Sequence, residues 1–167
     1  MTEHDPSLAT VAAFKAGMAR VPGAVHIVTT DGPAGRAGLT ATAVCSVTTD
    51  PPTLLVCVNE TSSVGQAFIS NEAVAINTVG PEFTSLAMLF GGKTPMEERF
   101  AASDWAVAAS GAPRHLGAAA SFDTRVVGGQ AVGSHRVLFC EVIDVTLGDD
   151  PTPCVYHDRA FKVLTSL

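Results

Sequence analysis

The chain has 167 residues, with 10 basic and 16 acidic side chains and a formal net charge of −6. Hydrophobic residues make up 47% of it and charged residues only 16%, which excludes an intrinsically disordered chain. The length suits one domain, expected over residues 8–167 after a flexible tail at 1–7. The acidic balance argues against nucleic-acid binding, and no segment is apolar for long enough to predict a membrane span.

Composition also bears on assembly and environment. So few charged side chains leave little polar surface to cover a monomer, which favours a homodimer. The N-terminus lacks a basic segment followed by an apolar one, so we expect a cytoplasmic protein. The histidines and cysteines show no metal-binding spacing, and we predict no metal site. The cysteines lie far apart, mostly in apolar runs, so we expect buried free thiols at Cys45, Cys57, Cys140 and Cys154.

In chain order, the first predicted element is a helix over residues 8–20, with Ser7 as its cap and one apolar stripe. A strand rich in β-branched residues follows at 24–30. A glycine-proline connection then leads into residues 39–49, whose alternation of small polar and apolar residues is typical of a hairpin. A double proline precedes the next strand, at 53–59.

The second half of the pattern mixes short helices with strands. A helix at 61–70, capped by Thr61 or Ser62, precedes a strand at 73–79. Residues 81–92 form an amphipathic pattern closed by glycine, which predicts a helix. Further strands are expected near 121–133, 135–148 and 154–164. Because short strands outnumber helices, we predict a mostly-β barrel with a few flanking helices.

The most informative segment is 38–48, GLTATAVCSVT. On a strand with a period of two, alternate residues share one face, lined here by hydroxyls and small groups. The members of that face are Thr40, Thr42, Val44 and Ser46. Hydroxyls and backbone N–H groups can bind a phosphate or the polar edge of a flavin without fixed charge. The same pattern is typical of the solvent face of an ordinary strand, so both interpretations stay open.

Common nucleotide-binding and hydrolase motifs are missing, since the sequence has no GxSxG, no GKS/T and no Rossmann fingerprint. The end of the strand at 53–59 offers another way to bind an anion. Asn59 is followed closely by Ser62 and Ser63, so hydroxyls and free amide groups can face a negative group there. Thr61 or Ser62 can also simply cap the helix, and the two roles are compatible.

Several segments together resemble one known family. GLTATAVCSVTTDPPTLLVCVN followed by SSVGQAF is similar to the flavin reductases with an FMN-binding split barrel, the reductase components of two-component flavin monooxygenases. The similarity extends, in order, over AFKAGMARVPGAVHIVTTDGPAGRAG, FGGKTPMEERFA, ASFDTRVV, AVGSHRVLFCEV and VYHDRAF. FGGKTPMEERF is particularly like the pyrimidine-utilisation branch; the 4-hydroxyphenylacetate monooxygenase reductases and a corrinoid-reducing branch are similar too.

The resemblance implies a Greek-key split β-barrel, a homodimer with flavin at the subunit interface, and hydride transfer from NADH or NADPH to FMN or FAD. The reduced flavin would serve a partner monooxygenase. A flavoprotein that reduces a corrinoid and a non-catalytic flavin-binding module are the alternatives. By position, the residues at the flavin would be Thr40, Thr42, Ala43 and Ser46, with Asn59, Ser62 and Ser63 at its phosphate or ribityl chain.

The segment FGGKTPMEERF supplies candidate cations. Lys93 and Arg99 are the expected partners of the phosphate, because the chain has few basic residues, although ordinary surface charges are the alternative. Phe100 and Trp105 are expected to fill a satellite core instead of stacking on a cofactor.

The family has Gly-Asp-His where this chain has Gly133-Ser134-His135. The resemblance implies that His135 is the catalytic residue, lying near the nicotinamide and orienting it, since hydride transfer needs alignment more than proton abstraction. Ser134 replaces the carboxylate that would orient the histidine. Tyr156 and Arg159 are assigned to the flavin or nicotinamide pocket, although Asp158–Arg159 can equally form a turn at a strand end.

Overall fold

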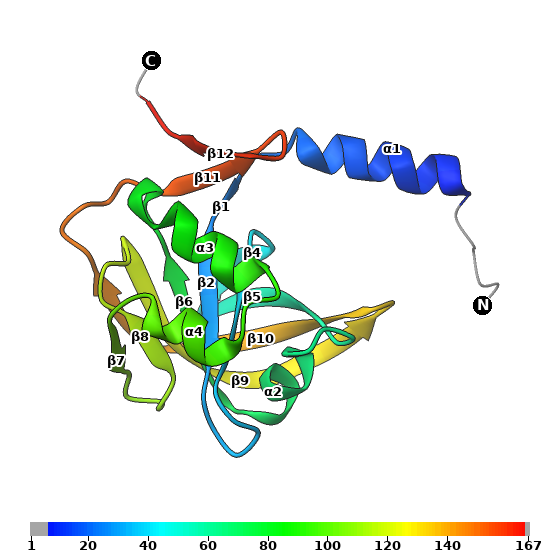
Figure 1. Ribbon diagram of the computed structural model, residues 1–167. Coiled ribbons are helices and arrows are strands. Elements are labelled where there is room, and N and C mark those ends of the chain that lie inside the picture. Colours follow the sequence, from blue (N-terminus) through cyan, green and yellow to red (C-terminus); the bar gives the residue numbers. More distant parts are fainter. Residues whose placement is uncertain (1–6, 166–167) are drawn as a thin grey trace.

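The computed structural model describes residues 7–165, and Figure 1 shows its ribbon. Strands dominate and a few short helices flank them, so the prediction of a mainly-β fold is confirmed. The expected tail at 1–7 falls, apart from Ser7, outside the described residues. Ser7 itself caps the first helix, where its Oγ accepts a hydrogen bond from the N–H of Thr10 at 3.2 Å, as predicted.

The largest sheet is antiparallel, with the strand order β3-β2-β6-β9-β10-β5-β4. Its strands are β2 (His26–Thr30), β3 (Ala37–Ala41), β4 (Val44–Thr49), β5 (Pro52–Asn59), β6 (Ala73–Thr78), β9 (Ala120–Val132) and β10 (His135–Leu147). The two edge strands follow each other in the chain, and Thr42 and Ala43 alone connect them. This short connection brings the end of β3 close to the start of β4, but no ladder joins the two strands within residues 7–165.

The expectation that Thr40, Thr42, Val44 and Ser46 share one face of a single strand over 38–48 is wrong, and so is that of a hairpin within 39–49. β3 pairs with β2 while β4 pairs with β5, so the two halves of the segment lie at opposite edges of the sheet. At the break, the carbonyl of Ala43 accepts a hydrogen bond from the N–H of Cys57 in β5 at 3.1 Å, so Ala43 already follows the side of β4. Alternation predicts an extended backbone but not its partner, which is why the break escaped the sequence pattern.

Two smaller sheets complete the strands. β1 (Gly23–Ala24), β11 (Cys154–His157) and β12 (Ala160–Val163) form a three-stranded sheet in the order β1-β11-β12. β7 (Trp105–Val107) and β8 (Pro113–His115) form a hairpin. The three-stranded sheet leads the chain into β2, above which it lies in Figure 1. It reaches the connection between β3 and β4, because a Cβ on Gly23 would lie 3.0 Å from Thr42 Cβ.

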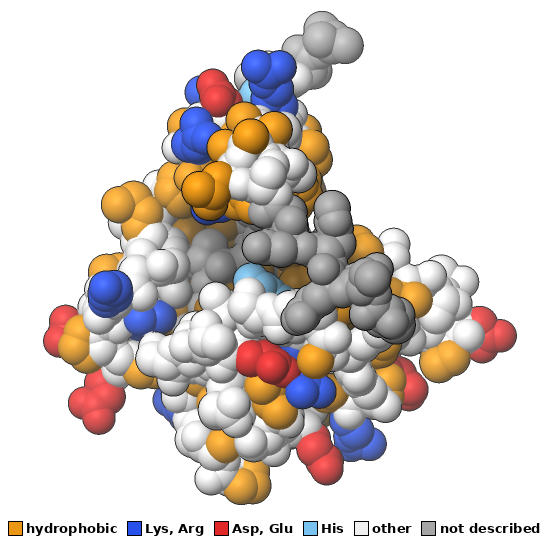
Figure 2. Space-filling model, turned by 90° about the vertical axis from the view of Figure 1, so that its right-hand side faces the viewer, with side chains coloured by type: hydrophobic (Ala, Val, Ile, Leu, Met, Phe, Trp, Pro, Cys, Tyr) orange, Lys and Arg blue, Asp and Glu red, His pale blue; other side chains and the backbone are white. Residues whose placement is uncertain are grey.

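The first helix, α1 (Leu8–Ala19), extends away from the sheets, as Figure 1 shows. Its predicted apolar stripe packs on nothing in the described chain, and Leu8 and Phe14 are 90% and 67% exposed. Figure 2 shows hydrophobic side chains reaching the surface at many points on the face turned to the right in Figure 1. These exposed apolar groups agree with the low charged fraction of the sequence.

The helix α2 (Gly65–Ser70) starts later than predicted, and neither Thr61 nor Ser62 caps it. The Oδ1 atom of Asn59 instead accepts hydrogen bonds from the N–H and the hydroxyl of Thr61, at 3.0 and 2.8 Å. A side-chain carbonyl that bonds the backbone two residues on forms a turn in place of a helical start. Asn59 therefore delays the helix to Gly65.

The predicted helix at 81–92 is split into a 3₁₀ turn, η1 (Pro81–Phe83), and α3 (Thr84–Gly91), and α4 (Met96–Ala101) follows. The buried face of α3 carries Leu86, Ala87 and Phe90, as the amphipathic pattern predicted. Phe100 and Trp105 pack into the same cluster as Phe90, which confirms that both are core residues.

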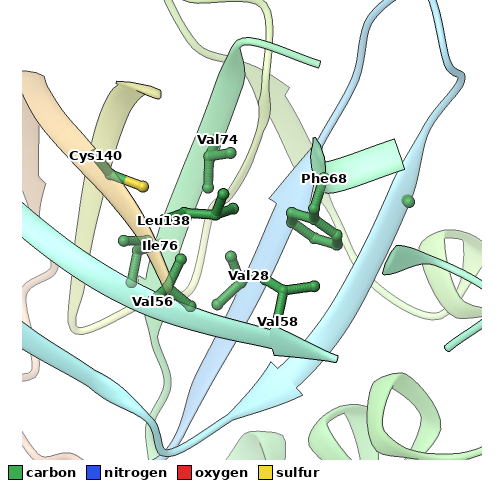
Figure 3. Packing of buried hydrophobic residues seen from close by; sticks show 9 residues of the cluster. Val28, Val56, Val58, Phe68, Val74, Ile76, Leu138 and Cys140 are labelled. Carbon is green, nitrogen blue, oxygen red and sulfur yellow. The ribbon is translucent and has the colours of Figure 1, made fainter. Parts of the chain in front are cut away.

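A second apolar cluster fills the inside of the large sheet, and Figure 3 shows its packing. Its labelled members are Val28, Val56, Val58, Phe68, Val74, Ile76, Leu138 and Cys140, each at most 2% exposed. The expectation of buried free thiols holds only in part. All four cysteines are free, but Cys140 and Cys154 are buried while Cys57 is half-buried and Cys45 is exposed.

Candidate functional site

A cavity of about 380 Å³ opens beside the connection between β3 and β4. We call it the junction cavity. Its lining residues come from β3, the Thr42–Ala43 connection, the turn after β5, the end of α3, α4 and the start of β10. They are Leu39, Thr40, Ala41, Thr42, Ala43, Cys57, Asn59, Ser62, Ser63, Val64, Phe90, Gly91, Gly92, Arg99 and His135.

Glycines shape one wall of the junction cavity. A Cβ on Gly38 would occupy the space of the Phe90 ring, so only glycine lets α3 approach β3 this closely. A Cβ on Gly91 would lie 3.7 Å from Thr40 Cβ, at ordinary van der Waals contact, so the glycine keeps a small gap beside the strand. The Oγ1 of Thr40 donates a hydrogen bond to the carbonyl of Ala87 at 2.6 Å and ties the strand to the helix. The wall is therefore fixed by this hydrogen bond and by the packing of Phe90 on Gly38.

The turn after β5 forms the polar end of the cavity. Ser62 donates from its Oγ to the carbonyl of Asn59 at 2.7 Å, which leaves the oxygen lone pairs of Ser62 available. The Ser63 side chain is exposed, and its backbone N–H has no acceptor among the described residues. The turn thus presents hydroxyl and amide groups, as the sequence predicted, although as a loop and not as a helix start.

His135 is the first residue of β10 and lies opposite Asn59 in the ladder between β10 and β5. The two-residue turn before it contains Gly133 at φ 58°, a conformation that suits glycine. The Oγ of Ser134 lies 3.0 Å from Nδ1 of His135. A serine hydroxyl therefore stands where the family pattern has a carboxylate, and Nε2 has no protein partner among the described residues.

Arg99 lines the cavity but is only 5% exposed, and its donors serve the protein. Its Nε donates to the carbonyl of Thr94 at 2.7 Å, and Nη2 donates to that of Gly92 at 2.8 Å. Its Nη1 donates to the carbonyls of Phe90 and Gly38, at 3.0 and 3.3 Å. We expected Arg99 to bind the phosphate. In the structure its guanidinium instead hydrogen-bonds the cavity wall, and its positive charge lies beside the cavity.

Four predicted site residues lie outside the junction cavity. Ser46 is exposed on β4, opposite Leu54 of β5, because the break at Thr42–Ala43 removed it from the face of Thr40. Lys93 lines a neighbouring hollow. Arg159 is exposed, at φ 58°, in the turn between β11 and β12.

Tyr156 belongs to a second, more apolar cavity of about 440 Å³. This cavity shares Thr40, Ala41, Thr42, Gly91 and Gly92 with the junction cavity, so the two lie on either side of one thin wall. Met88 and Phe161 complete its apolar lining, and sequence analysis missed both. The amphipathic pattern assigned residues of α3 to the core but gave no sign that an exposed methionine faces a cavity.

The ionisable groups in and near the site are few. Burial, and after it the neighbouring Cys45 thiol, raises the pKa of Cys57, so this cavity-lining thiol is neutral at pH 7 and is a poor nucleophile. Among residues 7–165 there is no group of three or more His, Cys, Asp or Glu side chains placed to hold a metal ion. None of the helices in this part of the chain has the length and hydropathy to cross a membrane.

A concave cavity with a few converging hydroxyl and amide groups is the usual form of a site for a small molecule or cofactor. The family model described as "Flavin reductase like domain" matches residues 18–165. The chain belongs to this flavin reductase-like family, as the sequence resemblance predicted.

Named relatives cover nearly the whole chain. It is 49% identical over 157 residues to the FMN reductase (NADH) RutF of Klebsiella variicola strain At-22, spanning 94% of this chain and 96% of the relative. The structure of the flavin reductase HpaC complexed with NADP+ is 26% identical, covers 94% of this chain and 99% of its own, and superposes with a TM-score of 0.85. BorF, the flavin reductase component of a bacterial two-component tryptophan halogenase, shares the fold at 23% identity, with a TM-score of 0.85 and coverage of 94% and 99%.

Proposed function

We propose that this protein is an NADH:flavin oxidoreductase with FMN as its flavin and FAD as the alternative. The observation that carries the proposal is the junction cavity, whose lining residues all lie within the segment that matches the flavin reductase family. The name FMN reductase (NADH) of relatives at 49% identity supports the choice of FMN and NADH.

The residues present fit a flavin. The cavity of about 380 Å³ lies in the size range of small-molecule sites, roughly 300–1,000 Å³. Ala43, Gly91 and Gly92 line it with little or no side chain, which leaves room for a flat ring. The exposed Ser63 and the lone pairs of Ser62 offer hydrogen-bonding partners for a ribityl chain or phosphate.

Each residue has a distinct part in this proposal. Thr40, Thr42 and Ala43 lie along the ring, and Asn59, Ser62 and Ser63 bind the polar tail. When bound, the flavin accepts a hydride at N5 from the nicotinamide. His135 binds and orients the nicotinamide through Nε2, while Ser134 holds the other ring nitrogen. Arg99 fixes the wall and supplies positive charge in a buried setting.

The wider organisation belongs to the same proposal. We infer a Greek-key split barrel, supported by the connection of the two edge strands through Thr42 and Ala43. A homodimer is supported by the exposed apolar side chains of α1, and a flavin at its interface by the open cavities beside β3. A single domain over 8–167 and a cytoplasmic location stay predictions. A partner monooxygenase as the consumer of reduced flavin is supported by the two-component system named for BorF.

NADH consumption tests the proposal. Purified protein mixed with FMN and an excess of NADH should lower the absorbance at 340 nm by many equivalents per protein molecule. Flavin binding without NADH consumption would instead indicate the non-catalytic binding module. Adding a corrinoid under anaerobic conditions tests the remaining alternative, because a corrinoid reductase would transfer electrons to it faster than free reduced flavin does.

A further inference from the structure

A hollow of about 680 Å³ adjoins the junction cavity on the side of the loop between α3 and α4. We call it the basic groove. Ser63, Val64, Gly92 and Arg99 line both spaces, so a ligand in the junction cavity can continue into the groove. The exposed Ser63 stands at the boundary, in the turn assigned above to the polar tail of the flavin.

The charge of the groove differs from that of the whole protein. The chain carries 16 acidic and only 10 basic side chains. Yet Arg36, Lys93 and Arg99 all line the groove, and none of its described lining residues is Asp or Glu. A hollow lined by one sign of charge attracts ligands of the opposite sign. The groove therefore suits an anion that this acidic protein would otherwise repel.

Two of the cations keep donors available for a ligand. The Nε of Arg36 pairs with Oδ2 of Asp31 at 2.9 Å, and its guanidinium carbon lies 5.4 Å from the centre of the Phe100 ring. These contacts fix the orientation of Arg36 and leave its terminal amino groups unpaired among the described residues. Lys93 is exposed and forms no ion pair within residues 7–165.

Neighbouring acidic side chains reduce the attraction of the groove for anions without cancelling it. Asp31 offsets part of the Arg36 charge, and Glu97 lines an adjacent hollow together with Arg36. Arg99 donates its hydrogen bonds to backbone carbonyls. It therefore contributes positive charge to the groove but no free pair of N–H groups for a ligand. Val64, Ala67 and Met96 also line the groove, and these three side chains are half-buried and apolar.

We propose that the basic groove binds the adenosine diphosphate moiety of a dinucleotide, with Arg36 and Lys93 on the diphosphate and the apolar lining residues against the adenosine. The proposal rests on the proposed function, since it extends the same site. Paired phosphates need cations, and arginine and lysine are the side chains that bind them. Arg36 and Lys93 then determine specificity for dinucleotides. The moiety is present in both FAD and NADH, and the experiment separates these two sources.

The test uses Arg36→Ala, Lys93→Ala and the double variant, with Arg125→Ala as the matched control. Arg125 is exposed and lines a different hollow, so its removal changes the net charge equally without touching the groove. Quenching of flavin fluorescence gives the Kd of FAD, FMN and riboflavin without any turnover. The KM for NADH is measured separately at saturating FMN.

If FAD supplies the diphosphate, the double variant weakens FAD by about tenfold more than FMN, and riboflavin is unaffected. If NADH supplies it, the KM for NADH rises by about tenfold while the Kd ratio of FAD to FMN stays constant. Arg125→Ala should change none of these values by more than about twofold. The proposal is overturned if neither the Kd ratio of FAD to FMN nor the KM for NADH changes, including the case in which FMN and FAD weaken equally. If the wild-type protein binds flavin but oxidises no NADH, the proposed function is wrong. The Kd ratio of FAD to FMN can still be measured in that case and still tests the groove.

Discussion

The guanidinium of Arg99 donates a hydrogen bond from Nη1 to the carbonyl of Phe90 at 3.0 Å. The ring of Phe90 in turn fills the space that a side chain on Gly38 would need. One buried cation thus holds the end of α3 against β3, where the glycine allows contact. Because both elements line the junction cavity, the shape of the site depends on a residue that donates four hydrogen bonds to backbone carbonyls.

Replacing Arg99 by lysine should therefore destabilise the fold. Lysine keeps the charge but cannot reach four carbonyls with one ammonium group, so buried acceptors lose their partners. We expect the free energy of unfolding to fall by about 2–4 kcal/mol, measured by urea denaturation. Arg125→Lys, at an exposed position, should stay within about 0.5 kcal/mol of wild type. Equal stability of the two variants would contradict the role given to Arg99.

The break in the 39–49 segment leads us to expect different effects of substitutions at Thr42 and Ser46. Thr42 lines the junction cavity and Ser46 does not, although simple alternation places both on one face. Thr42→Leu should weaken FMN binding by about tenfold or more, because a larger side chain enters the space of the ring. Ser46→Leu should leave the Kd within about twofold of wild type. Fluorescence titration of FMN measures both, and a stronger effect at Ser46 would place the flavin elsewhere.

His135 should affect the nicotinamide more than the flavin. His135→Ala is expected to raise the KM for NADH by about ten- to a hundredfold, since lost alignment slows hydride transfer, while the Kd of FMN stays nearly constant. A purely structural histidine would instead lower the melting temperature and leave the kinetics per folded molecule unchanged. Ser134→Asp should be tolerated, because its carboxylate can take over the contact that the Ser134 Oγ makes with Nδ1.

Stability should decline in mild acid because of two buried histidines. Burial lowers the pKa of His26 to about 4, and it lowers that of His115 to about 4 against the opposing effect of Asp104. The unfolded chain then binds more protons than the folded one between pH 6.5 and 4, so stability is full above 6.5 and is lost as the pH falls towards 4. Each histidine should cost about 2 kcal/mol between pH 7 and pH 5.

Urea denaturation at pH 7 and pH 5 measures this loss. His26→Gln should reduce the pH dependence by the share of one histidine, because glutamine can keep a hydrogen bond to Thr78 without titrating. Protonation should be more unfavourable at His115 than at His26, because Nδ1 of His115 is buried without a hydrogen-bond partner among the described residues. A stability that is flat across this range would show that these rings are hydrated in the folded state.

Local sequence was enough for the features that depend on neighbouring residues. Ser7 marks the start of α1, and the apolar run at 53–59 follows β5 closely, because caps and strand patterns act over a few residues. The order of segments that resemble the flavin reductases was enough to indicate the family from the sequence alone. Asn59, Ser62 and Ser63 were brought together by the turn that they form themselves.

Tertiary structure decided which strands pair and which polar groups are already used. Ser46 left the site because β4 pairs with β5 while β3 pairs with β2, a choice made between segments far apart in the chain. Arg99 is buried because four carbonyls from three segments converge on it, which no spacing in FGGKTPMEERF reveals. The basic groove likewise exists only after folding, since Arg36 and Lys93 lie far apart in sequence and meet in space. Periodicity depends on local backbone geometry, whereas pairing and burial depend on contacts between distant residues.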